Sequence, residues 1–101
     1  MENSYHVIIS NRAEENLDQI IAYLELEWNE GVKNNFIDKL KEIIALLEVN
    51  PLLFEKYSRK KNIHKCLITK HNAMYYRIID TTVEIITIHD TRRNPNTLKL
   101  F

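Results

Sequence analysis

The sequence has few residues that interrupt helices and strands or form disulfides: its 101 residues include one glycine, two prolines and one cysteine. A single cysteine excludes an intramolecular disulfide and fits a reducing compartment. With 45% hydrophobic and 28% charged residues, the composition is that of a folded chain rather than a disordered one. We therefore expect one domain over residues 1–101, with flexibility confined to the tail at 94–101.

Net charge and long apolar segments are also absent. Fourteen basic residues balance fourteen acidic ones, which argues against non-specific coating of nucleic acid, because that binding grows with the number of phosphates neutralised. No apolar run is long enough to span a bilayer, and the first residues lack the apolar core of a signal peptide. We expect a cytoplasmic protein without membrane contact, in which the distribution of basic residues matters more than their sum.

Apolar periodicity predicts a short strand followed by two helices. Residues 5–10 have the β-branched centre of a strand. The first helix begins at Ser10 or Asn11, the second ends at Asn50-Pro51, and Gly31, the only glycine, marks the turn between them. The two apolar stripes consist of Ala13, Leu17, Ile20, Ile21, Leu24 and Trp28, and of Phe36, Ile37, Leu40, Ile43, Ile44 and Leu47.

Three strand-like segments follow a loop at 51–62. They cover residues 63–69, 73–80 and 83–89, and the short turns between them make neighbouring strands antiparallel. The first strand has no nearby partner and must pair with a later strand across the helices. The sequence therefore predicts an α+β fold in the order β-α-α-β-β-β, with a helical hairpin on one face of a four-stranded, mainly antiparallel sheet.

The last hairpin decides which side chains share a face. With Thr81-Thr82 as a two-residue turn, Arg77 faces Ile86 and Met74 faces His89, so Arg77 and His89 point to opposite faces. Arg77 then lies diagonal to Glu84, where an ion pair is the structural alternative to a functional role. A one-residue change in the turn reverses this assignment.

A polar cluster near the C-terminal end holds the candidate catalytic groups. Histidine titrates near neutrality, and cleavage of RNA through its 2′-hydroxyl needs a base, an acid and cations that stabilise the developing charge. A structural histidine at a strand end is the alternative. The candidate catalytic residues are His89, Arg92, Arg93 and Arg77.

Other cations are candidates for contacting a target, although the basic loop at 56–61 is also typical of a simply solvated segment. These candidates are Lys65, Lys70, His71, Arg59, Lys60 and Lys61. Cys66 with nearby His64 has the residue types of a nucleophile and its base, but a buried small hydrophobe is the expected role. Metal-binding and phosphate-binding motifs are missing, so we expect no metal and no cofactor.

Several short motifs, taken in order, resemble the RelE/ParE superfamily of toxins over nearly the whole chain. Residues 74–80 (MYYRIID) resemble its aromatic-Tyr-Arg-hydrophobic strand. Residues 83–95 (VEIITIHDTRRNP) resemble the closing strand of the ParE-like branch, which ends in a histidine followed by a basic pair. The start of the first helix, Ala13-Glu14-x-x-Leu17, and the Asn50-Pro51 stop also fit.

The resemblance implies a type II toxin that a cognate antitoxin neutralises. ParE-like members are associated with poisoning DNA gyrase, whereas RelE-like members cut messenger RNA on the ribosome without a metal. Ala73 stands where RelE-like members often carry arginine, and no tyrosine follows the last strand. These departures favour the ParE-like branch. A ribosome-dependent endoribonuclease using His89 and an inactive antitoxin-binding module remain the alternatives.

The face of the sheet away from the helices and the apolar C-terminal tail are the expected partner surface. The tail reads Leu98-Lys99-Leu100-Phe101. An antitoxin segment that folds on binding would suit such an apolar patch. The alternative is that the tail folds back on its own domain.

Overall fold

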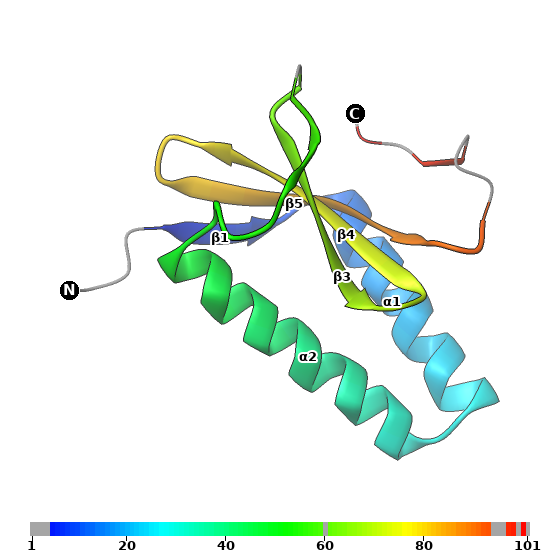
Figure 1. The fold of residues 1–101 in the computed structure, drawn as a ribbon. Helices are drawn as coiled ribbons and strands as arrows, with labels where there is room; N and C mark the ends of the chain where they lie inside the picture. Colours follow the sequence, from blue (N-terminus) through cyan, green and yellow to red (C-terminus); the bar gives the residue numbers. More distant parts are fainter. Residues whose placement is uncertain (1–4, 60, 94–96, 99, 101) are drawn as a thin grey trace.

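The computed structural model describes residues 5–59, 61–93, 97–98 and 100, and both helices lie on the same side of one sheet (Figure 1). The sheet order is β1-β5-β4-β3-β2, with β1 parallel to β5 and the other pairs antiparallel. The predicted α+β fold is confirmed. Its elements are β1 His6–Ile9, α1 Asn11–Glu27, α2 Glu30–Val49, β2 Lys56–Ser58, β3 Ile63–Thr69, β4 Asn72–Ile79 and β5 Thr82–Asp90.

The sheet has five strands where the sequence predicts four. The additional strand, β2, lies inside the segment expected to be a loop, and it pairs with the start of β3 in an irregular register. Its three residues are too few to show the alternation that identifies a strand in a sequence. The first strand does pair across the helices, because β1 lies beside β5.

Side-chain caps fix where both helices begin. Ser10 caps α1, accepting a hydrogen bond from the amide of Ala13, and Asn29 caps α2 in the same way. α1 ends at Glu27, and because α2 begins directly after its cap at Asn29, Gly31 lies inside the first turn of α2. The expectation that Gly31 forms the turn is wrong, because the extended backbone around Asn29 already reverses the chain without a left-handed residue.

The sheet buries side chains on both faces. On the helix face, Tyr76 is fully buried, and its hydroxyl donates to the carbonyl of Pro51 at 2.7 Å. The other face, called the open face below, has a smaller apolar cluster against which Leu98 and Leu100 pack. The described part of the tail thus folds back on the domain, and the rest of the segment predicted to be flexible lies outside the described residues. The open-face cluster consists of Ile63, Ala73, Tyr75 and Ile86.

The turn between β4 and β5 differs from the predicted one by one residue. Ile79 pairs with Thr82, so the turn is Asp80-Thr81, and Asp80 adopts the left-handed conformation with a φ of 53°. Short acidic and amide side chains tolerate that conformation better than threonine does. The predicted Thr81-Thr82 turn, and the register derived from it, are wrong.

The corrected register places two candidate residues on one face. Arg77 faces Glu84 directly, and His89 faces Ala73. Because Ala73 and Arg77 are four residues apart on the same strand, alternation puts both on the open face. His89 and Arg77 therefore share a face, contrary to the expectation.

Candidate functional site

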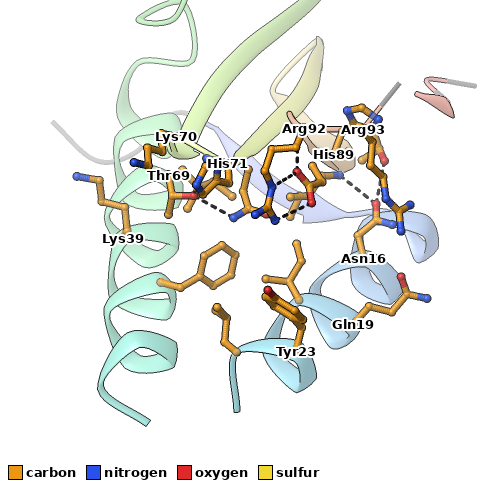
Figure 2. A pocket seen from close by; sticks show the side chains of 18 of the residues that line it. Asn16, Gln19, Tyr23, Lys39, Thr69, Lys70, His71, His89, Arg92 and Arg93 are labelled. Carbon is orange, nitrogen blue, oxygen red and sulfur yellow. Dashed lines mark hydrogen bonds and ion pairs between the residues drawn. The ribbon is translucent and has the colours of Figure 1, made fainter. Parts of the chain in front are cut away.

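A groove with a volume of about 1050 Å³ lies between the helical hairpin and the far end of the sheet (Figure 2). We call it the helix–sheet groove. Its walls are formed by α1 along most of its length, the first half of α2, the β3–β4 turn and the end of β5. Its apolar lining consists of Ile20, Tyr23, Leu24, Trp28, Val32, Phe36, Ile68 and Ile88.

Cationic and imidazole side chains form the rim of the helix–sheet groove. Figure 2 shows Lys39 on α2 near Thr69 and Lys70 of the β3–β4 turn, with Arg92 and Arg93 of the chain after β5 across the groove. Among the described residues that line the groove, Asp90 alone is acidic. The groove therefore combines an apolar floor with a positive rim. The rim consists of Arg12, Lys39, Lys70, His71, His89, Arg92 and Arg93.

Asp90 adds little negative charge to the groove because Arg92 holds it. The Arg92 guanidinium donates to both carboxylate oxygens, at 3.0 and 2.9 Å, and the Arg92 amide donates to one of them. The hydrogen bond from Arg92 is the largest cause that lowers the pKa of Asp90 to about 2. The carboxylate is therefore charged at any physiological pH and compensated by its own neighbour.

His89 stands where the groove meets the open face. Burial lowers the pKa of its imidazole, as do the charges of Arg93 and Lys65, while Asp90 opposes the shift. The imidazole is thus held in its neutral form near pH 7, which suits a proton acceptor. However, Nε2 lies 3.1 Å from the hydroxyl of Thr97, so this nitrogen already has a partner.

A second, smaller pocket of about 220 Å³ opens beside His89 on the open face. We call it the open-face pocket. Its lining brings an imidazole, two cations and two phenols together, with Leu98 at one side, which is the kind of setting that suits an anion. The lining residues are Tyr57, Lys65, Tyr75, His89, Thr91, Arg93 and Leu98.

The structure does not bring Arg77 into this cluster. Its guanidinium lies 2.7 Å from a carboxylate oxygen of Glu84, so the ion pair proposed as the structural alternative is present. Arg77 is also four residues along β4 from Ala73, the partner of His89, or about 13 Å. Its functional role stays a prediction without geometric support.

The basic target-binding candidates lie at separate places, with Lys65 on β3 at the open-face pocket. Lys70 and His71 lie at the β3–β4 turn on the rim of the groove. Arg59 and Lys61 lie before β3, at its opposite end, and Lys60 is outside the described residues. A single target surface that uses all of them is therefore not assembled.

Cys66 is a buried structural residue, as expected. Burial raises the pKa of its thiol to about 11, so little thiolate exists near neutrality. His64 is also buried and stacks on the ring of Tyr76 at 5.1 Å. Its Nδ1 lies 2.8 Å from the carbonyl oxygen of Phe54, which can only accept, so Nδ1 carries the proton. This histidine anchors a loop and does not activate the cysteine.

Sequence reasoning missed the helical walls of the groove. Tyr23 is 46% exposed and Trp28 is 61% exposed, although the apolar stripe placed Trp28 in the core. An aromatic residue at the very end of an amphipathic helix was the available signal, because the sheet does not extend far enough to cover it. Asn16 interrupts the first stripe with a polar side chain, and its role was also unforeseen.

Two negative findings concern the described part of the chain alone. Within it, no cluster of histidine, cysteine, aspartate and glutamate has an arrangement that could hold a metal ion. Neither α1 nor α2, the two helices in the described ranges, is long and apolar enough to cross a bilayer.

Comparison with known proteins gives a family match and three similar structures. Residues 7–95 match the family model for the ParE toxin of the type II toxin–antitoxin system parDE. Among curated proteins, none is similar enough in sequence to match. A chromosomal ParDE toxin–antitoxin system from P. aeruginosa aligns with a TM-score of 0.71 and 12% identity, covering 88% of this chain and 98% of the other.

Two further solved structures share the fold. The YoeB dimer from Staphylococcus aureus aligns with a TM-score of 0.61 and 14% identity, covering 85% of this chain and 95% of the other. YafQ from E. coli strain BL21(DE3) aligns with a TM-score of 0.59 and 13% identity, covering 87% and 94%. Identities this low bear on the fold alone, whereas the family match spans all the rim residues.

Proposed function

Because this chain belongs to the ParE toxin family of type II toxin–antitoxin systems, we propose that it inhibits DNA gyrase by binding to it, not by cutting RNA. The family makes the protein a toxin with a cognate antitoxin as its partner. Gyrase acts in the cytoplasm, and we place the toxin there. What carries the proposal is the positive end of β5 beside the helix–sheet groove, a combination of cations and apolar surface that suits contact with another protein.

The groups best suited to RNA cleavage are already engaged, which also supports binding. Nε2 of His89 lies beside the Thr97 hydroxyl, and Arg92 is held on both oxygens of Asp90. A transition-state cation has to face the phosphate, and a general base needs a free nitrogen. Nε2 of His89 and the guanidinium of Arg92 meet these conditions only after these contacts are exchanged.

The helix–sheet groove is the surface we assign to the antitoxin. An amphipathic helix binds such a groove with its apolar side, and acidic residues at its edges would pair with Lys39, Lys70 and Arg93 on the rim. The near-neutral overall charge of the toxin makes this local positive rim the main electrostatic guide to the antitoxin. The target-facing surface then includes the exposed end of β5, which an antitoxin in the groove would cover.

A specific observation favours one other function, that of a ribosome-dependent endoribonuclease. His89, Lys65 and Arg93 surround the open-face pocket together with two tyrosines, and these residue types fit a phosphodiester. If this alternative is correct, His89→Ala abolishes cleavage of transcripts in a translating extract.

The deciding experiment is a supercoiling assay with purified DNA gyrase and relaxed plasmid. We expect the toxin to inhibit supercoiling and the cognate antitoxin to relieve that inhibition. A translating extract receives the same toxin preparation in parallel. Intact gyrase activity together with cleaved transcripts would reject the proposal in favour of the nuclease, and normal growth of cells that express the toxin alone would point to an inactive binding module.

A pair of lysines on one helix tests the groove. Lys39 lines it and Lys41 does not, although both are exposed residues of α2. Lys39→Glu should raise the Kd for the antitoxin about tenfold, the effect of about 1.4 kcal/mol from a lost charge contact and a new repulsion. Lys41→Glu makes the same change in charge outside the groove, and equal effects of both substitutions would exclude the groove as the antitoxin site.

A further inference from the structure

β5 carries one residue more than β4 along their shared length. Tyr76 pairs with Ile85, but the preceding residue on β4, Tyr75, pairs with Thr87. Ile86 is left without an opposite residue and forms a β-bulge. Such bulges change the direction in which the following side chains point.

The bulge decides which face receives His89. Val83 and Ile85 lie in the helix-face core before the bulge, and Ile88 lies there after it. His89 then faces Ala73, a member of the open-face cluster. Strict alternation from Val83 would place His89 on the helix face and Ile88 on the open face.

α1 supplies the groups that satisfy β5 beyond the end of β1. β1 stops at Ile9, the partner of Ile85, and among the residues that the structure describes no strand follows this edge of β5 further. The side chain of Asn16 takes over: its Oδ1 accepts from the amide of Ile88 at 3.0 Å and from the hydroxyl of Thr87 at 2.8 Å. Thr87 and Ile88 are both buried, so leaving either donor without an acceptor would cost free energy.

Ser10 holds the other side of the bulge. Its hydroxyl donates to the carbonyl of Ile86 at 2.7 Å, and its amide donates to that of Ile85 at 3.0 Å. Ser10 is also the cap of α1, so its loss would disturb the helix as well. Asn16 lies inside α1 and does not cap it, so its substitution tests the bulge more directly.

We propose that Asn16 is a positioning residue that fixes the β5 bulge and thereby sets His89, and the chain from Asp90 to Arg93 after it, between the helix–sheet groove and the open face. The role of these residues at a target rests on the proposed function. The register itself does not, because it can be measured in the isolated toxin. Figure 2 shows Asn16 reaching from α1 toward the end of β5 beside Arg93.

The test compares Asn16→Ala with Asn16→Asp by NMR. In the unaltered protein we expect cross-strand NOEs between His89 and Ala73, and NOEs from the imidazole to Tyr75 or Leu98. Asn16→Ala removes the oxygen that accepts from both donors, so both sets of NOEs should be lost. Asn16→Asp keeps an oxygen at the same position and should restore them. An Asn16→Ala protein that keeps these NOEs, even with reduced stability, would overturn the proposal.

Gln19→Ala is the matched control, because Gln19 is an exposed residue of the same helix that also lines the groove. It should leave all the NOEs in place. If Asn16→Ala does not fold, Thr87→Val removes one of the two bonds, and the imidazole NOEs should weaken at least twofold relative to the control. Unchanged intensities contradict the proposal. If the unaltered toxin does not inhibit supercoiling, the gyrase target is rejected, but the NMR measurement of the β5 register stays valid.

Discussion

The ion pair between Asp90 and Arg92 shows how one residue contact shapes the chemistry of the site. Arg92 is the more exposed partner, and it folds back on a carboxylate two residues earlier instead of extending over the groove. From the sequence alone, Arg92 and Arg93 were equal candidates for a catalytic role. Their positions in the sequence did not indicate that Arg92 pairs with Asp90 while Arg93 lines the open-face pocket.

Asp90→Asn tests this contact through pH. A carboxylate whose pKa is lowered stabilises the folded protein at a pH above its ordinary value of 3.8, and that contribution disappears as the pH falls through about 2. The pair is exposed, so we expect a small effect at pH 7, a decrease in Tm of about 2–4 °C.

Thermal unfolding of both proteins from pH 7 to pH 2 provides the measurement. The difference in Tm should stay constant down to about pH 4 and then shrink toward zero. Glu25→Gln serves as a comparison, because it removes the ion pair with Lys33 between the two helices and leaves Asp90 unchanged. A difference in Tm for Asp90→Asn that is unaltered at the lowest pH would contradict the linkage.

At the scale of elements, the sequence predicts the helices and strands that are long enough to show a periodic apolar pattern. The stripe of α2 is correct, with Phe36, Leu40, Ile43 and Leu47 all buried. The three later strands also lie where their β-branched segments indicate. Periodicity does not encode β2, which is too short, or the bulge at Ile86, which depends on Asn16 about seventy residues away. The sequence therefore predicted several residues of the candidate site but not their arrangement in space.

The loop before β2 is held to the sheet by polar contacts that no local pattern predicts. The hydroxyl of Tyr76 donates to Pro51 and the imidazole of His64 donates to Phe54. Tyr76→Phe should leave the buried carbonyl of Pro51 without a donor and lower the free energy of unfolding by about 1–3 kcal/mol.

Urea denaturation at equilibrium measures this loss. Tyr57→Phe is the matched control, since Tyr57 is about half exposed and its ring stays against Tyr75 in either form. The control should differ from the unaltered protein by less than about 0.5 kcal/mol. Equal midpoints for Tyr76→Phe and the control would show that the loop does not depend on this hydrogen bond.

At the scale of the whole molecule, helices cover one face of the sheet while the chain's own C-terminal residues cover part of the other (Figure 1). No helix residue contributes to the open-face cluster, which is covered by Leu98 and Leu100 and, at Tyr75, by the ring of Tyr57. Both leucines pack against this cluster.

Replacing both leucines by serine tests this dependence. Each side chain is partly buried, so losing the pair should lower the free energy of unfolding by about 2 kcal/mol. The uncovered cluster should also bind an apolar dye such as ANS, which fluoresces on exposed hydrophobic surface. Leu26→Ser is the control, because Leu26 is already 82% exposed and its loss uncovers nothing. If the double variant matches this control in both stability and dye binding, the cluster is closed by the sheet itself, and the tail is not what keeps the open face of the toxin from solvent.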